Sequence, residues 1–172
     1  MRLLFTLLIT LNAPLIAQDN WSQFRGPGTD GNARGDLPRS WNKKTNIVWK
    51  AKVHDRGWSS PVIWKNQVWL TTALKDGRKL FAVCLDRKSG KVIHDLHIFD
   101  VEKPQRIATI NSYASPTPAI EDKRVYLHYG TYGTACLDTS TGRKVWTRRD
   151  LNCDHEDRAG PGGSIFLMGD LL

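Results

Sequence analysis

One motif occurs twice in this chain, as AVCLDRKSGKVIH at residues 82–94 and as TACLDTSTGRKVW at residues 134–146. Cys84 and Cys136 are 136 − 84 = 52 positions apart, and Gly90 and Gly142 have the same spacing. The match extends upstream, where WSSPV at residues 58–62 corresponds to YASPT at residues 113–117. A tandem repeat of this length predicts stacked copies of one supersecondary unit, each unable to bury its apolar faces alone.

Each copy is predicted to contain four short strands separated by turns. Asp86 and Gly90 in one copy, and Asp138 and Gly142 in the other, mark the turn before the last strand, because aspartate accepts turn N–H groups and glycine tolerates a positive φ. No stretch after residue 17 shows a convincing helical periodicity. The predicted strands are 60–64, 67–73, 80–85 and 91–97 in the first copy, and 115–120, 124–129, 134–137 and 144–148 in the second.

Fragments of further units flank the two copies. Residues 47–50 (IVWK) resemble the last strand at 144–147 (KVWT), and residues 163–166 (GSIF) resemble the opening of a third unit. Four-stranded units repeated at this spacing are typical of β-propeller blades. The sequence therefore predicts an all-β partial propeller over residues 47–172, with blades at about 58–99 and 113–151 and a third begun at 163. Residues 18–46 are predicted to form an extended N-terminal segment.

The repeated motif resembles that of the propellers of the pyrroloquinoline-quinone (PQQ) type, in which a tryptophan ends each blade and docks on the next. Trp146 occupies this position, whereas His94 replaces the tryptophan in the first copy. The chain also resembles secreted PQQ-like repeat proteins of planctomycete-like bacteria. The matching segments are 21–27 (WSQFRGP), 57–62 (GWSSPV), 111–118 (NSYASPTP) and 132–138 (YGTACLD).

The resemblance implies a larger assembly, because propellers of this kind close with roughly seven or eight blades. Two blades and fragments cannot close a ring, and their outer faces would leave apolar surface uncovered. We therefore expect the chain to be the N-terminal fragment of a longer propeller that needs its downstream blades.

The first residues predict export. Arg2 precedes an apolar run from Leu3 to Leu11, and Ala17 is a small residue in front of the polar Gln18. This order is that of a secretory signal peptide, and the run is too short for a membrane span. We expect residues 1–17 to be removed and the mature protein to be periplasmic or secreted.

The net charge and the cysteine content bear on possible partners and on disulfide bonds. The formal net charge is 25 − 17 = +8, but the basic residues are scattered beside turn glycines, so no nucleic-acid partner is predicted. Cys84 and Cys136 occupy equivalent repeat positions and are expected to be buried small hydrophobic residues. With Cys153 the count is three, so at least one thiol is unpaired within the chain and no pairing can be assigned.

Catalytic chemistry is harder to assign. Membership of the quinoprotein dehydrogenases would imply PQQ, a calcium ion and an adjacent cysteine pair, and this chain has no adjacent pair. The polar cluster at 152–158, with Cys153, His155 and Arg158, could ligate a metal, but its spacing matches no strong motif and favours a polar interblade loop. The connection at 99–112 is longer than a blade requires, which is consistent either with a binding loop or with structural packing.

We therefore expect no catalytic, cofactor or metal residue in this chain. The function predicted is a non-catalytic exported β-propeller that binds or scaffolds a protein partner in the cell envelope. The alternative is the N-terminal part of a PQQ-dependent dehydrogenase, for which PQQ and calcium would be the cofactors.

Overall fold

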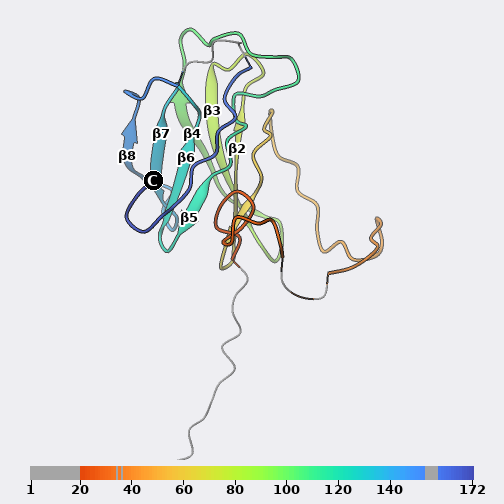
Figure 1. Ribbon diagram of the computed structural model, residues 1–172. Helices are drawn as coiled ribbons and strands as arrows, with labels where there is room; N and C mark the ends of the chain where they lie inside the picture. Colours follow the sequence, from red (N-terminus) through yellow and green to blue (C-terminus); the bar gives the residue numbers. More distant parts are fainter. Residues whose placement is uncertain (1–19, 34, 36, 154–158) are drawn as a thin grey trace, which may run out of the picture.

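Two four-stranded antiparallel sheets form the fold of the computed structural model, which describes residues 20–33, 35, 37–153 and 159–172. No helix occurs in these ranges, so the prediction of an all-β chain is confirmed. The first sheet contains β1 (Val62–Trp64), β2 (Gln67–Ala73), β3 (Lys79–Asp86) and β4 (Val92–Asp100). The second sheet contains β5 (Ala119–Glu121), β6 (Arg124–His128), β7 (Thr134–Asp138) and β8 (Lys144–Arg148) (Figure 1).

The two sheets have the same order and the same irregularity. Each is a meander in which every strand pairs with the next along the chain. The pairing of β3 with β4 shifts register after Cys84, and the pairing of β7 with β8 shifts after Cys136. A bulge at the same repeat position in both copies bends the strand and increases its twist there. The sequence repeat is therefore a structural repeat as well.

The sheets pack together around one shared core. Buried side chains of both sheets, among them Trp69, Leu80, Val125 and Leu127, belong to one contiguous cluster. The Tyr129 hydroxyl also donates to the carbonyl oxygen of Phe81 in the other sheet at 2.8 Å. Neither sheet thus buries its apolar face alone, as expected for stacked repeat units.

The segment at residues 21–23 is hydrogen-bonded to the first strand of each sheet, β1 and β5. Trp21 exchanges two backbone hydrogen bonds with Ile63 of β1, both at 2.8 Å. The carbonyl oxygen of Ser22 accepts from the N–H of Ile120 in β5 at 2.8 Å. Gln23, which is buried, accepts the N–H of Leu167 with its Oε1 at 3.1 Å. Four hydrogen bonds thus tie the two sheets and the last segment to this stretch.

The flanking fragments differ from the prediction in one respect. Residues 47–50 and 163–166 are not assigned as strands, although Met168 and Leu171 pair across the turn at Gly169-Asp170. A strand needs a hydrogen-bonded neighbour, and within the described residues neither stretch pairs with one. Their resemblance to strands of the repeat therefore leads to a strand only where a partner is present.

Candidate functional site

The turn before the last strand is built identically in both sheets. The Asp86 carboxylate accepts the N–H of Ser89 at 2.7 Å, and the Asp138 carboxylate accepts the N–H of Thr141 at 2.9 Å. Hydroxyl and backbone donors of the turn hold the pKa of both carboxyl groups below the ordinary range, with Ser89 and Ser140 contributing most. Ionised aspartate thus fixes the turn at the positions that the sequence predicted.

The glycine of this turn provides a flat platform. Gly90 has φ = 70° and Gly142 has φ = 72°, a backbone region that side-chain-bearing residues rarely adopt. In both turns the glycine N–H donates to the carbonyl oxygen of the turn aspartate at 2.8 Å. Because no side chain rises from the glycine, another group can pack directly on the backbone.

In the first sheet, the indole of Trp49 covers this platform. A Cβ added at Gly90 would lie only 2.6 Å from two carbons of the Trp49 ring. The Trp49 Nε1–H donates to the carbonyl oxygen of Arg87 at 2.8 Å. The ring therefore packs directly against the turn glycine, and the hydrogen bond to the Arg87 carbonyl holds it there.

In the second sheet, His94 of the first sheet takes the same place. A Cβ added at Gly142 would lie 3.2 Å from His94 Nδ1. His94 Nε2 lies 3.3 Å from the carbonyl oxygen of Thr139, which can only accept. Thr139 is equivalent to Arg87, since 139 − 87 = 52. Trp49 and His94 therefore occupy equivalent positions, each beside the turn of the sheet that follows it in the chain. At Gly142 the contact is looser and is shared with Leu96, whose Cδ1 would lie 3.0 Å from the added Cβ.

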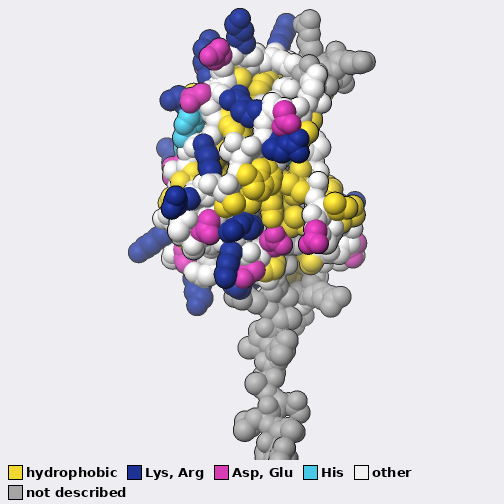
Figure 2. Space-filling model, turned by 90° about the vertical axis from the view of Figure 1, so that its left-hand side faces the viewer, with side chains coloured by type: hydrophobic (Ala, Val, Ile, Leu, Met, Phe, Trp, Pro, Cys, Tyr) yellow, Lys and Arg dark blue, Asp and Glu magenta, His cyan; other side chains and the backbone are white. Residues whose placement is uncertain are grey.

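The third equivalent residue is Trp146, since 146 − 94 = 52. Its ring contacts Tyr126 of its own sheet at 6.1 Å between centroids, and the residue is 36% exposed. All five residues of β8 are exposed, among them Val145. Apolar side chains gather on this side of the molecule (Figure 2). Among the residues that the structure describes, the second sheet thus presents Trp146 and an apolar face without the cover that the first sheet receives.

His54, which the sequence analysis did not single out, links the chain that precedes β1 to β4. His54 Nδ1 lies 2.6 Å from Asp55, and Nε2 lies 2.9 Å from Asp95. Burial lowers the pKa of His54, but hydrogen bonds to the two carboxylates and their charges outweigh it, so the pKa is raised. The only sequence signal was an aspartate beside each of two histidines, at 54–55 and 94–95.

The cysteines are unpaired in the described part of the chain. Cys84 and Cys136 are buried, and burial raises the pKa of the Cys84 thiol to about 12. Cys153 is partly exposed, whereas its predicted companions His155 and Arg158 lie outside the described residues. The structure therefore does not test the polar cluster as a unit.

No ligand set for a cation can be named from the described ranges, because no three His, Cys, Asp or Glu side chains converge there. The comparisons add no relative: no family model matches the chain, and no curated protein matches it. No helix in the described part of the chain has the length and apolar character needed to cross a membrane.

Proposed function

We propose that this chain forms part of an exported β-propeller that acts as a non-catalytic binding scaffold, with a protein partner in the cell envelope. The observation that carries this proposal is the docking contact, made by Trp49 on Gly90 and by His94 on Gly142. A contact made at equivalent positions of both copies supports a propeller, because each blade of a propeller packs on the next.

The exposed face around Trp146 supports a proposal for what binds there. Trp49 and His94 each dock on a four-stranded sheet whose third strand ends in an Asp-x-x-x-Gly turn. The same residue position in the second sheet is therefore complementary to a third sheet of the same kind. Contiguous apolar surface of this sort marks a protein interface rather than a solvated face.

Export is proposed from the signal-peptide pattern of residues 1–17, which lie outside the described residues. Without export, the scaffold would have no access to a partner in the envelope. N-terminal sequencing of the exported protein tests this part: a product that begins at Gln18 supports it, and an intact Met1 on a cytoplasmic product contradicts it.

A chimera tests the docking proposal. Residues 115–151, which contain the second sheet, would replace residues 164–172, since Ser164 corresponds to Ser115. If the appended turn covers Trp146, its fluorescence should shift to shorter wavelength and the melting temperature should rise. A Trp146→Phe version of the chimera isolates the emission of this residue from that of the seven other tryptophans, six native and one in the appended copy.

The matched control is the same chimera with valine at the turn glycine of the appended copy. The valine side chain would rise into the space that Trp146 needs, so the fluorescence shift should disappear. Equal spectra for the glycine and valine chimeras would contradict the docking proposal. Stoichiometric binding of PQQ in the presence of calcium would instead favour the dehydrogenase.

A further inference from the structure

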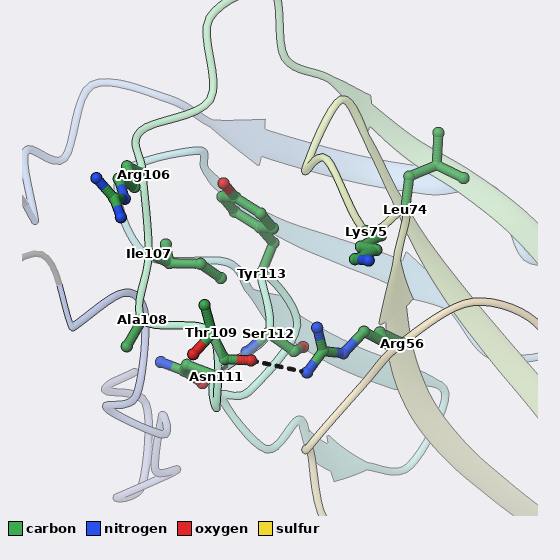
Figure 3. Close-up of a pocket in the computed structure, with 10 residues that line it drawn as sticks. All are labelled: Arg56, Leu74, Lys75, Arg106, Ile107, Ala108, Thr109, Asn111, Ser112 and Tyr113. Carbon is green, nitrogen blue, oxygen red and sulfur yellow. Dashed lines mark hydrogen bonds between the residues drawn. The ribbon is translucent and has the colours of Figure 1, made fainter.

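A cavity of about 380 Å³ lies between the first sheet and the chain that leads to the second. One wall is the connection at residues 106–113, and the other is formed by Arg56 and by the β2–β3 turn at Leu74 and Lys75 (Figure 3). Its volume is at the lower end of the range for small-molecule sites, so it would hold only a compact ligand.

Hydrogen bonds within the connection hold this cavity in shape. The Tyr113 hydroxyl donates to the carbonyl oxygen of Gln105 at 2.6 Å, and the Gln105 N–H donates to the Tyr132 hydroxyl at 3.0 Å. Arg56 reaches across from the other wall and donates to the carbonyl oxygen of Thr109 at 3.1 Å. The two walls are therefore fixed to each other before any ligand arrives.

The rim is cationic. Arg56, Lys75 and Arg106 line the cavity, and none of its lining residues is acidic. Within the described residues, no hydrogen bond or ion pair engages the Lys75 ammonium or the Arg106 guanidinium. The carboxylate of Asp76, next in the chain to Lys75, accepts the N–H of Arg78 at 3.0 Å within its own turn. The Arg106 side chain points away from the cavity (Figure 3), so of these two groups the Lys75 ammonium is the one available to an anion inside it.

The remaining wall is suited to an organic body rather than to a bare ion. Apolar surface is supplied by Leu74, Ile107 and the buried Tyr113. Polar atoms are added by Thr109 and Ser112. A guanidinium or ammonium group at an apolar wall recognises a carboxylate by a charge-assisted hydrogen bond. The combination selects for a charged group attached to a small carbon skeleton.

We propose that this cavity binds a small organic carboxylate, with its charge at Lys75 and its carbon skeleton against Ile107 and Tyr113. The cavity is made by one sheet and its connection, so this site does not depend on whether a third sheet docks at Trp146. Arg56 is part of the scaffold because it holds Thr109, and it is left unchanged in the test.

The experiment titrates the ¹⁵N-labelled full chain with D-glucuronate and follows amide shifts, with neutral D-glucose and inorganic sulfate as parallel probes. Glucuronate should shift the amides of Thr109 and Ser112, and glucose should not. Lys75→Gln should weaken glucuronate binding about five-fold, the effect of losing one partly exposed ionic contact. Lys88→Gln, with the same charge change at the opposite end of the first sheet, should leave binding unchanged.

Three results would overturn the proposal. The first is that glucuronate leaves the cavity amides unshifted at up to roughly 50 mM, about the weak limit for a specific site. Lys75→Gln and Lys88→Gln could weaken binding equally, which would show a general effect of net charge. Sulfate could bind as well as glucuronate, in which case the cavity recognises charge without an organic body. Amide spectra of the unliganded variants show whether each remains folded.

Discussion

Replacing Gly90 with alanine tests the docking contact at its most constrained point. Gly90 has φ = 70°, and an added Cβ would lie 2.6 Å from the Trp49 ring. Real Cβ atoms do not approach other atoms this closely, so the indole must move. The matched substitution Gly142→Ala has almost the same backbone angle, 72°, but its nearest contacts are Leu96 at 3.0 Å and His94 at 3.2 Å.

The expected cost has two parts. A side-chain-bearing residue in the left-handed region costs about 1–2 kcal/mol, and this part is common to both substitutions. Moving Trp49 breaks its bond to Arg87, worth about 1 kcal/mol, and loses part of the packing of the ring, worth about another 1 kcal/mol. Gly90→Ala should therefore lower the free energy of unfolding by about 3–4 kcal/mol, and Gly142→Ala by about 1–2 kcal/mol.

Urea unfolding followed by circular dichroism measures both values. A double-mutant cycle with Trp49→Ala separates the two parts, because without the indole only the backbone cost of Gly90→Ala remains. The coupling between positions 49 and 90 should be about 1–2 kcal/mol. Equal destabilisation by the two glycine substitutions, or no coupling, would refute the idea that the ring depends on this platform.

Three further predictions concern protonation and thiol chemistry. Hydrogen bonds lower the folded-state pKa of Asp138, so its contribution to stability is fully present above its unfolded pKa of about 4 and is lost as the pH falls toward the folded pKa. Thermal melts between pH 2 and 7 should show that Asp138→Ala destabilises the protein most at neutral pH and progressively less toward pH 2. The raised pKa of His54 gives a contribution that is present below about pH 6.5 and is lost as the pH rises through the folded pKa; Asp95→Asn should lower that pKa in an imidazole NMR titration, and an unchanged value would contradict the bridge. Ellman's reagent should modify Cys153 in the native protein and Cys84 only after unfolding, since burial raises the pKa of the Cys84 thiol to about 12; rapid native labelling of Cys84 would be inconsistent with its burial.

The positions of the strands could be predicted because turn chemistry marks their ends in both copies. The predicted and observed strands begin and end within about two residues of each other, except that β5 begins at Ala119 instead of at residue 115 and β4 continues to Asp100. That extension follows a register shift after Leu80, opposite which Ile98 and Phe99 are both buried. Two consecutive buried residues break the alternation expected of a strand, so the pattern alone could not show that pairing continues.

Only part of the docking contact could be predicted from the sequence. The resemblance predicted a tryptophan at the position of Trp146, and the structure shows that Trp49 and His94 occupy equivalent positions. That His94 keeps the bond to a turn carbonyl could not be predicted, because it depends on the orientation of the ring against Thr139. The segment at 21–23 was expected only to be extended, since its partners lie more than 40 residues away in β1 and β5.

The cavity lies where the two copies differ. The first copy is three residues longer, since the upstream spacing is 115 − 60 = 55 and the downstream spacing is 52, and the extra residues are at the β2–β3 turn around Lys75. The connection at 101–118 likewise follows the first sheet. Residues shared by both copies, such as Asp86 and Asp138, maintain the stacking of the sheets and cannot be altered in one copy without cost. Residues present in one copy only are free of that constraint, so a ligand site can develop there while the repeated framework stays intact.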